Sequence, residues 1–187
     1  SGIGQTASPL VIDIDGALRS AGAGEDVVIR QVGGDLVIGS VGSDNGALVL
    51  DAADASIDAL AGFDGINLFG QSMQLTAKRD IGNATNPLRV RVAPVGQLTG
   101  SAGGEINLFS PGNALDIGTL TSVGDLRVTT GLGADLSAAR ITASQGDITL
   151  ASGNDAELDQ VTATQGGIVL SAVNDLELVS AALVKSG

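Results

Sequence analysis

A short motif returns about every 20 residues along this chain, and this repeat restricts the possible folds more than any other feature of the sequence. Near the C-terminus "NDAEL" (154–158) returns as "NDLEL" (174–178). Short triplets with apolar outer residues return with the same step, which is typical of strands with one buried face. They are Val27–Ile29, Leu48–Leu50, Ile66–Leu68, Ile106–Leu108, Leu126–Val128, Ile148–Leu150 and Ile168–Leu170.

Each step holds two further short strands, separated by Gly, Asn and Ser. Three short strands in about 20 residues predict one coil of a parallel β-helix. We therefore predict an all-β solenoid of about nine coils, which at ~4.8 Å per coil is a rod roughly 40 Å long. One series of these strands begins at Leu115, Leu136, Ala156 and Leu176, and the other at Leu120, Ile141 and Val161.

A longer period of about 78 residues lies over the short one, and a fixed period is the signature of a repeat architecture. "IGQTASPLVI" from Ile3 matches "IGNATNPLRV" from Ile81, which aligns Pro9 with Pro87. We expect two equivalent long units, each of roughly four coils, within a single β-helical segment that is part of a larger chain. The expected ranges are 2–79 and 80–158 for the long units, 159–187 for further coils, and 1–187 for the whole segment.

The composition limits the function classes. Net charge is −12 and no basic stripe is present, which disfavours nucleic acid and anionic membranes as partners. No apolar run approaches the ~18 residues that span a bilayer, so membrane insertion is not expected. The chain has no Cys for disulfides or thiolate metal sites, and no His, the commonest general base. Some parallel β-helices degrade pectate, but the acids here recur in columns without a unique pair, so we expect no enzyme.

Stacking the coils places acidic residues in outward columns, which have two interpretations. The first is a solvated acidic face that keeps the rod soluble, because like charges ~5 Å apart in water cost only on the order of 1 kcal/mol. The second is Ca²⁺ bridging between coils, because hard cations take several oxygen ligands. No other cofactor is expected. The candidate Ca²⁺ ligands are Asp155, Glu157, Asp175 and Glu177.

Two further groups of polar residues follow the repeat. Asn113, Asn154 and Asn174 fall at one turn, where we expect amide hydrogen bonds from coil to coil and a left-handed backbone conformation that Asn tolerates. Four cations surround the second "IG" segment. Either they hold an anionic glycan or they neutralise neighbouring aspartates. These candidate ligand-binding residues are Lys78, Arg79, Arg89 and Arg91.

The paired "IG…PL" segments, together with "SAGGEINLFSPG" and "GDITLASGNDAELDQVTATQGG", resemble the repeat region of filamentous-haemagglutinin-like exoproteins. These are giant bacterial surface adhesins, many of them exported by two-partner secretion. The resemblance extends over essentially all 187 residues and rests on the style of the repeat. It implies a right-handed parallel β-helix that forms part of a long extracellular shaft at the bacterial cell surface.

The resemblance implies a structural role in attachment or biofilm formation, with host- or cell-surface glycans or proteins as partners of the parent adhesin. The alternative is a carbohydrate- or surface-binding module, which Ca²⁺ stiffens if the acidic columns bind it. A unique patch of converging polar groups favours the binding module, whereas uniform faces favour the shaft. Open end coils are exposed sheet edges, so we also expect end-to-end stacking of the segment.

Overall fold

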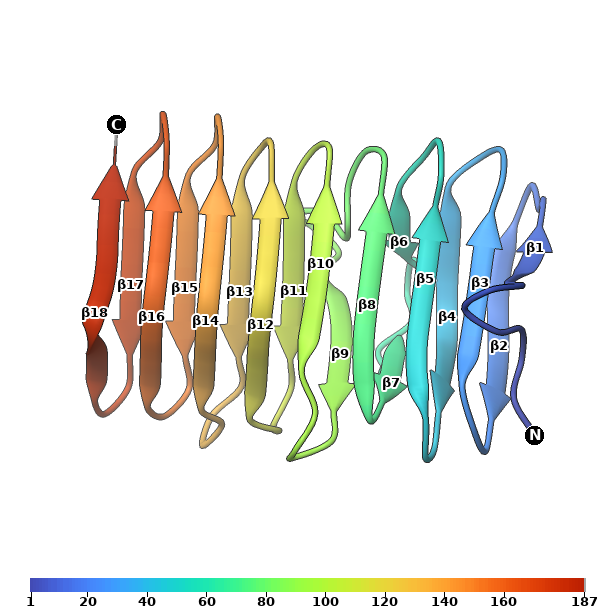
Figure 1. Cartoon of the computed structure of the whole chain (residues 1–187), viewed down its shortest axis with the longest axis horizontal. Helices are drawn as coiled ribbons and strands as arrows, with labels where there is room; N and C mark the ends of the chain where they lie inside the picture. The colour runs from blue at the N-terminus through green and yellow to red at the C-terminus, as the bar shows by residue number, and fades with distance from the viewer. Residues whose placement is uncertain (187) are drawn as a thin grey trace.

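The computed structural model describes residues 1–186 and shows parallel strands stacked in about eight coils (Figure 1). The strands form two nine-stranded sheets that face each other. In Figure 1 the front strands ascend and the back strands descend as the chain advances from the N-terminus to the C-terminus, which is a right-handed winding. The predicted parallel β-helix is confirmed, with about eight coils where the sequence predicts about nine. Over the described residues, no helix has the length and apolar character needed to cross a membrane.

The two sheets are named by their place in Figure 1. The front sheet contains β1 (Leu10–Ile12), β3 (Val27–Gln31), β5 (Ala47–Ala52), β8 (Ser72–Ala77), β10 (Leu98–Ala102), β12 (Leu115–Ser122), β14 (Leu136–Ala143), β16 (Ala156–Ala163) and β18 (Leu176–Ser186). The back sheet contains β2 (Ala17–Ala23), β4 (Leu36–Ser43), β6 (Ile57–Ala59), β7 (Leu68–Gly70), β9 (Leu88–Val92), β11 (Ile106–Ser110), β13 (Leu126–Thr130), β15 (Ile148–Ser152) and β17 (Ile168–Ala172).

In the coils from residue 115 onward, two of the three short strands expected per coil are joined into one continuous strand. In β12 the expected strands meet at Gly118 and Thr119, two successive residues that are not buried between the buried Ile117 and Leu120. The alternation of buried and outward-facing residues shifts by one residue at this point. The parallel pairing of β12 with β14 continues on both sides of the shift. The coil therefore has two sheets, and the change of phase gives the sequence the appearance of a third strand.

The two long units are three and a half coils apart, where the sequence predicts roughly four. Leu36 and Leu115 occupy equivalent positions of the two units and begin β4 and β12, but these strands lie in opposite sheets. In the same way β5, in the front sheet, corresponds to β13, in the back sheet. The triplets at Val27 and Leu48 therefore lie in the front sheet, whereas those from Ile106 onward lie in the back sheet. Triplets with the same sequence pattern therefore lie in both sheets, because the long unit includes half a turn.

Both "IG" segments form the same small hairpin turn. Gln5 pairs with Ser8 in the first segment, and Asn83 pairs with Asn86 in the second. The glycine at the start of each turn has a φ of 67°, in the left-handed region that glycine adopts at no steric cost. In the second hairpin, which lies between two coils, Asn86 Nδ2 also donates to the carbonyl oxygen of Ala59 at 2.8 Å.

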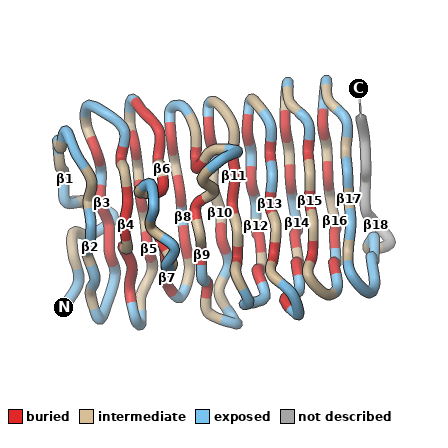
Figure 2. The backbone as a smooth tube through the Cα atoms, turned by 180° about the vertical axis from the view of Figure 1, so that it is seen from behind, coloured by how far each residue is buried: buried red, intermediate tan, exposed pale blue. Residues whose placement is uncertain are grey.

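The coils around this second hairpin are longer than the others. The step along the chain from Val41 to its partner Leu68 is longer than the step from Leu136 to its partner Ala156. The additional residues lie in the loop between β6 and β7 and in the hairpin before β9. Figure 2, seen from behind, shows both of these loops lying over the back sheet. One stretch of the back face therefore differs from the regular coils.

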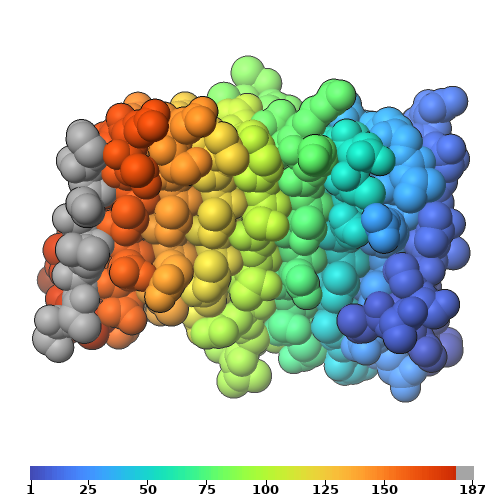
Figure 3. All heavy atoms as spheres, turned by 45° about the horizontal axis from the view of Figure 1, so that its top comes forward, coloured from blue at the N-terminus to red at the C-terminus, as the bar shows by residue number. Residues whose placement is uncertain are grey.

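The core is a row of aliphatic side chains between the two sheets. In Figure 2 the backbone of the buried residues is red along both sheets. Figure 3 shows the coils as successive bands in direct contact, as expected when each coil packs on its neighbours. The core is less well covered in the last coil. Leu158 is 1% exposed, whereas Leu178, its partner in the next coil, is 46% exposed.

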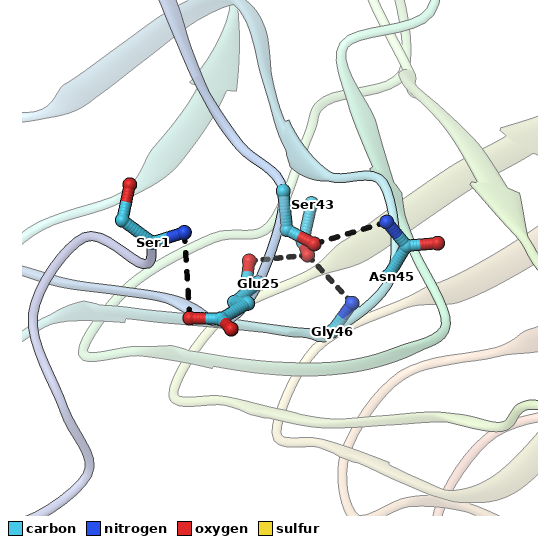
Figure 4. A network of polar contacts seen from close by, with 6 residues as sticks. Ser1, Glu25, Ser43, Asn45 and Gly46 are labelled. Carbon is cyan, nitrogen blue, oxygen red and sulfur yellow. Dashed lines mark hydrogen bonds and ion pairs between the residues drawn. The ribbon is translucent and has the colours of Figure 1, made fainter.

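Buried hydroxyl groups at the ends of strands bond to the turns. Ser43 Oγ donates to the carbonyl oxygen of Glu25 and accepts the N–H of Gly46 at 2.7 Å (Figure 4). In the same turn Asn45 Nδ2 donates to a backbone carbonyl of the preceding coil at 3.1 Å. The amino group of Ser1 forms an ion pair with Glu25 at 3.5 Å. Later turns use Ser110, Ser122, Thr130 and Ser152 in the same way.

Candidate functional site

Aspartates that directly precede a strand or β-bridge accept backbone hydrogen bonds from the next coil. Oδ1 of Asp125 accepts the N–H of Asp147 at 2.9 Å, and Oδ1 of Asp147 accepts the N–H of Gly167 at 2.7 Å. In each case the donor occupies the equivalent position one coil later. We call this set of bonds the aspartate ladder. Its other acceptors are Asp26, Asp35, Asp80, Asp135 and Asp155.

The candidate Ca²⁺ ligands lie in the predicted columns. Glu157 pairs in register with Glu177, and Oδ1 of Asp155 accepts the N–H of Asp175 at 3.1 Å. All four residues border an elongated groove with a volume of 520 Å³. Among residues 1–186, no three acidic side chains converge in an arrangement that holds a metal ion. One oxygen of Asp155 belongs to the aspartate ladder, and Ca²⁺ binding stays a prediction.

The Asn column forms amide hydrogen bonds between the last coils. Asn174 Nδ2 donates to Asn154 Oδ1, and Asn154 Nδ2 donates to Asp135 Oδ1 at 2.6 Å. The predicted coil-to-coil ladder is therefore confirmed at these positions. The predicted left-handed backbone is wrong, because every described residue with a positive φ is a glycine. The amide side chain, and not a special backbone conformation, accounts for asparagine here.

Two carboxyl groups near the second hairpin have a raised pKa: Asp58 in β6 and Glu105 directly before β11. Burial raises the pKa of Asp58, and the charges of Asp35 and Asp80 raise it further, against the lowering effect of a 3.4 Å hydrogen bond from Asn83. Burial also raises the pKa of Glu105, and neighbouring aspartate charges add to the effect. Acidic residues therefore repel one another here, and protonation relieves that repulsion.

The structure separates the four candidate cations into two pairs. Lys78 and Arg79 are exposed in the turn that follows β8. Arg89 and Arg91 lie on the outer face of β9, where they alternate with three buried aliphatic residues. Among the side chains of residues 1–179, none of the four forms an ion pair, so they do not neutralise the described aspartates by direct contact.

Arg89 and Arg91 each lie over a phenylalanine ring instead. Cζ of Arg89 is 5.3 Å from the ring centroid of Phe109, and Cζ of Arg91 is 5.5 Å from that of Phe69. Each pair is in register across neighbouring strands of the back sheet. An exposed cation–π contact contributes about 0.5–1 kcal/mol. A Cβ atom at Gly42 would overlap the ring of Phe69, so glycine is required beneath it.

We call these four residues, Arg89, Arg91, Phe69 and Phe109, the arginine–phenylalanine patch. Sequence reasoning identified its cations but missed its rings. The available signal was alternation, because Phe69 lies between the buried residues Leu68 and Gly70 and must therefore face outward. The strands of the back sheet carry four arginines and one aspartate, although the chain has a net charge of −12. Positive charge is thus concentrated on this face.

A polar hollow with a volume of 220 Å³ adjoins the patch where β4, β7 and β9 end. Its origin is a difference in turn length. Only Gln71 connects β7 to β8, whereas residues 44–46 follow β4 and residues 93–97 follow β9. The short connection leaves a depression between its longer neighbours. The side chains that line it include Ser43, Asp44, Phe69, Gln71, Arg91 and Asn113.

Comparison of the chain with protein-family models, with curated proteins and with solved structures finds no match. The resemblance to filamentous-haemagglutinin-like adhesins therefore stays a prediction.

Proposed function

We propose that this chain is a structural segment of a large, secreted bacterial surface adhesin. In this role it is a stiff shaft that holds other parts of the adhesin away from the cell and supports attachment or biofilm formation. The observation that carries the proposal is the continuity of both nine-stranded sheets, with each coil packed on the coils before and after it. The extracellular location belongs to the same proposal and rests on the sequence resemblance.

The proposed role is structural and not catalytic. Seven aspartates of the described chain recur at equivalent positions and accept backbone hydrogen bonds. Carboxylates held in this way serve the connection between coils, because each one extends the hydrogen-bond ladder beyond the end of a strand. The chain has no histidine to act as a general base beside them.

Binding of the labelled segment to a broad glycan panel and to intact cells tests the structural role. The measurement is made with millimolar Ca²⁺ and with chelator, on a sample whose circular dichroism shows β-structure. A shaft gives no saturable binding in either condition, and small-angle scattering shows an elongated particle. Saturable binding to cells or glycans contradicts a purely structural segment.

One observation favours a second function, recognition of a surface glycan. The arginine–phenylalanine patch occurs once, on the irregular stretch of the back face, whereas the aspartate ladder recurs along the rod. A spacer does not need a unique group of cations and aromatic rings. We propose a carbohydrate-binding module as the alternative, with this patch as its ligand-binding surface.

A further inference from the structure

The hollow beside Arg91 combines an open guanidinium group with neutral and acidic hydrogen-bonding groups. The Arg91 side chain forms no ion pair within the described residues, and its guanidinium is held over Phe69 at 5.5 Å. Its N–H groups are therefore available to a ligand. Gln71 Nε2 donates to the carbonyl oxygen of Asp44 at 3.2 Å, which joins two of the residues that line the hollow.

We infer that this hollow binds a carboxylated sugar residue of the uronic acid type, an inference that rests on the second proposed function, recognition. The carboxylate of the sugar accepts two parallel hydrogen bonds from Arg91, the geometry for which a guanidinium group is suited. The Asp44 carboxylate accepts from sugar hydroxyls, and the Asn113 amide bonds to them as donor or acceptor. A hollow of 220 Å³ has room for one sugar ring.

Charge selects this ligand class over polyanions. Arg91 is the one cation that lines the hollow among the described residues, and Asp44 is the one acidic residue there. One guanidinium matches one carboxylate. A phosphate or sulfate chain carries more negative charges than a single uronate, so a molecule with a net charge of −12 repels it more strongly. A neutral sugar leaves the guanidinium unpaired and loses the bidentate contact.

Titration of the ¹⁵N-labelled chain with D-glucuronate, D-glucose and acetate, followed by NMR, tests the inference. Glucuronate shifts the side-chain amide signals of Gln71 and Asn113 in a saturable manner, and glucose and acetate bind at least tenfold more weakly. Arg91→Ala weakens glucuronate binding at least tenfold. Arg127→Ala is the matched control, because Arg127 is exposed on β13 and does not line the hollow. This control retains the affinity of the original chain.

A second variant covers the case in which Arg91→Ala lowers the melting temperature. Arg91→Lys keeps the charge but not the planar pair of donors, so it binds glucuronate more weakly than the original chain and more tightly than the alanine variant. Equal affinity of all the Arg91 variants overturns the inference, and so does equal binding of acetate and glucuronate. Saturable binding of a neutral glycan without any binding of glucuronate overturns the acidic-sugar assignment but leaves recognition standing.

Discussion

The aspartates that precede the strands act as hydrogen-bond acceptors as well as charges. Each carboxylate carries the ladder one residue beyond the strand, to a backbone N–H that would otherwise lack a protein partner at the turn. This arrangement explains why Asp is placed in register from coil to coil despite the repulsion between like charges. The residue that donates its N–H to the carboxylate is Asp or Glu in some coils and a neutral residue in others. Its side chain can vary because the donor is always the backbone.

Asp125→Ala tests this role in a single turn. Loss of the 2.9 Å bond to the N–H of Asp147 should destabilise the chain by about 1 kcal/mol, a typical net contribution of one hydrogen bond. That corresponds to a fall in Tm of about 2–4 °C for a chain of this size. Asp125→Asn keeps an acceptor oxygen and should retain most of the stability. Asp64→Ala, at an exposed loop position, is the control, and an equal loss there would contradict the ladder.

Asp58→Asn should raise the Tm at neutral pH. Because the folded-state pKa of Asp58 is raised above its usual value of 3.8, the folded chain binds this proton more tightly than the unfolded chain does. The contribution of Asp58 to stability is therefore present below pH 3.8 and is lost as pH rises through the folded pKa. The asparagine removes this cost and still accepts the bond from Asn83.

Thermal unfolding of the original chain and of Asp58→Asn from pH 7 down to pH 4 checks this prediction. The difference in Tm should shrink as the pH falls, because Asp58 becomes protonated in the original chain. Asp64→Asn removes an equal charge from an exposed position and corrects for net charge. A difference between the two variants that does not change with pH would exclude Asp58 as the titrating group.

At the scale of strands, sequence alternation predicts which residues face inward but not the sheet to which a strand belongs. The outward positions of Arg89 and Arg91 follow from the pattern of β9. The pairing of these arginines with Phe109 and Phe69 does not, because it depends on the register between strands of successive coils. The number of residues per coil varies along the chain, and the differences accumulate from coil to coil. Triplets with the same sequence pattern therefore lie in the front sheet early in the chain and in the back sheet later.

The groove along the starts of β12, β14 and β16 provides a test of Ca²⁺ binding. If the carboxylates of neighbouring coils bridge the ion, the Tm should be higher in millimolar Ca²⁺ than in chelator at matched ionic strength. Glu157→Gln should abolish that increase, because Glu157 borders the groove with an exposed carboxylate. Magnesium at the same concentration controls for screening by a divalent ion. An identical Tm in Ca²⁺ and chelator would reject bridging.

For the whole molecule, the exposed core of the last coil supports the prediction of end-to-end stacking. Leu176 and Leu178 are 44% and 46% exposed, and Leu10 at the other end is 44% exposed. A second copy stacked on the last coil would cover these residues and would pair the free strand edges. Sedimentation should show association that increases with concentration. Leu178→Asp should keep the chain monomeric while preserving its β-rich spectrum, and a monomer at high concentration in the original chain would refute stacking.

The half coil in each long unit determines the symmetry of any rod that such units build. Successive units are related by a rotation of about 180° and, for coils ~4.8 Å apart, a rise of roughly 17 Å, which is the operation of a two-fold screw axis. The two hairpins follow this operation. The first, which contains Gln5 and Ser8, adjoins the front sheet, whereas the second, which contains Asn83 and Asn86, adjoins the back sheet. A feature present once per unit therefore projects to alternate sides, and such a fibre can engage neighbours on both flanks at the same time.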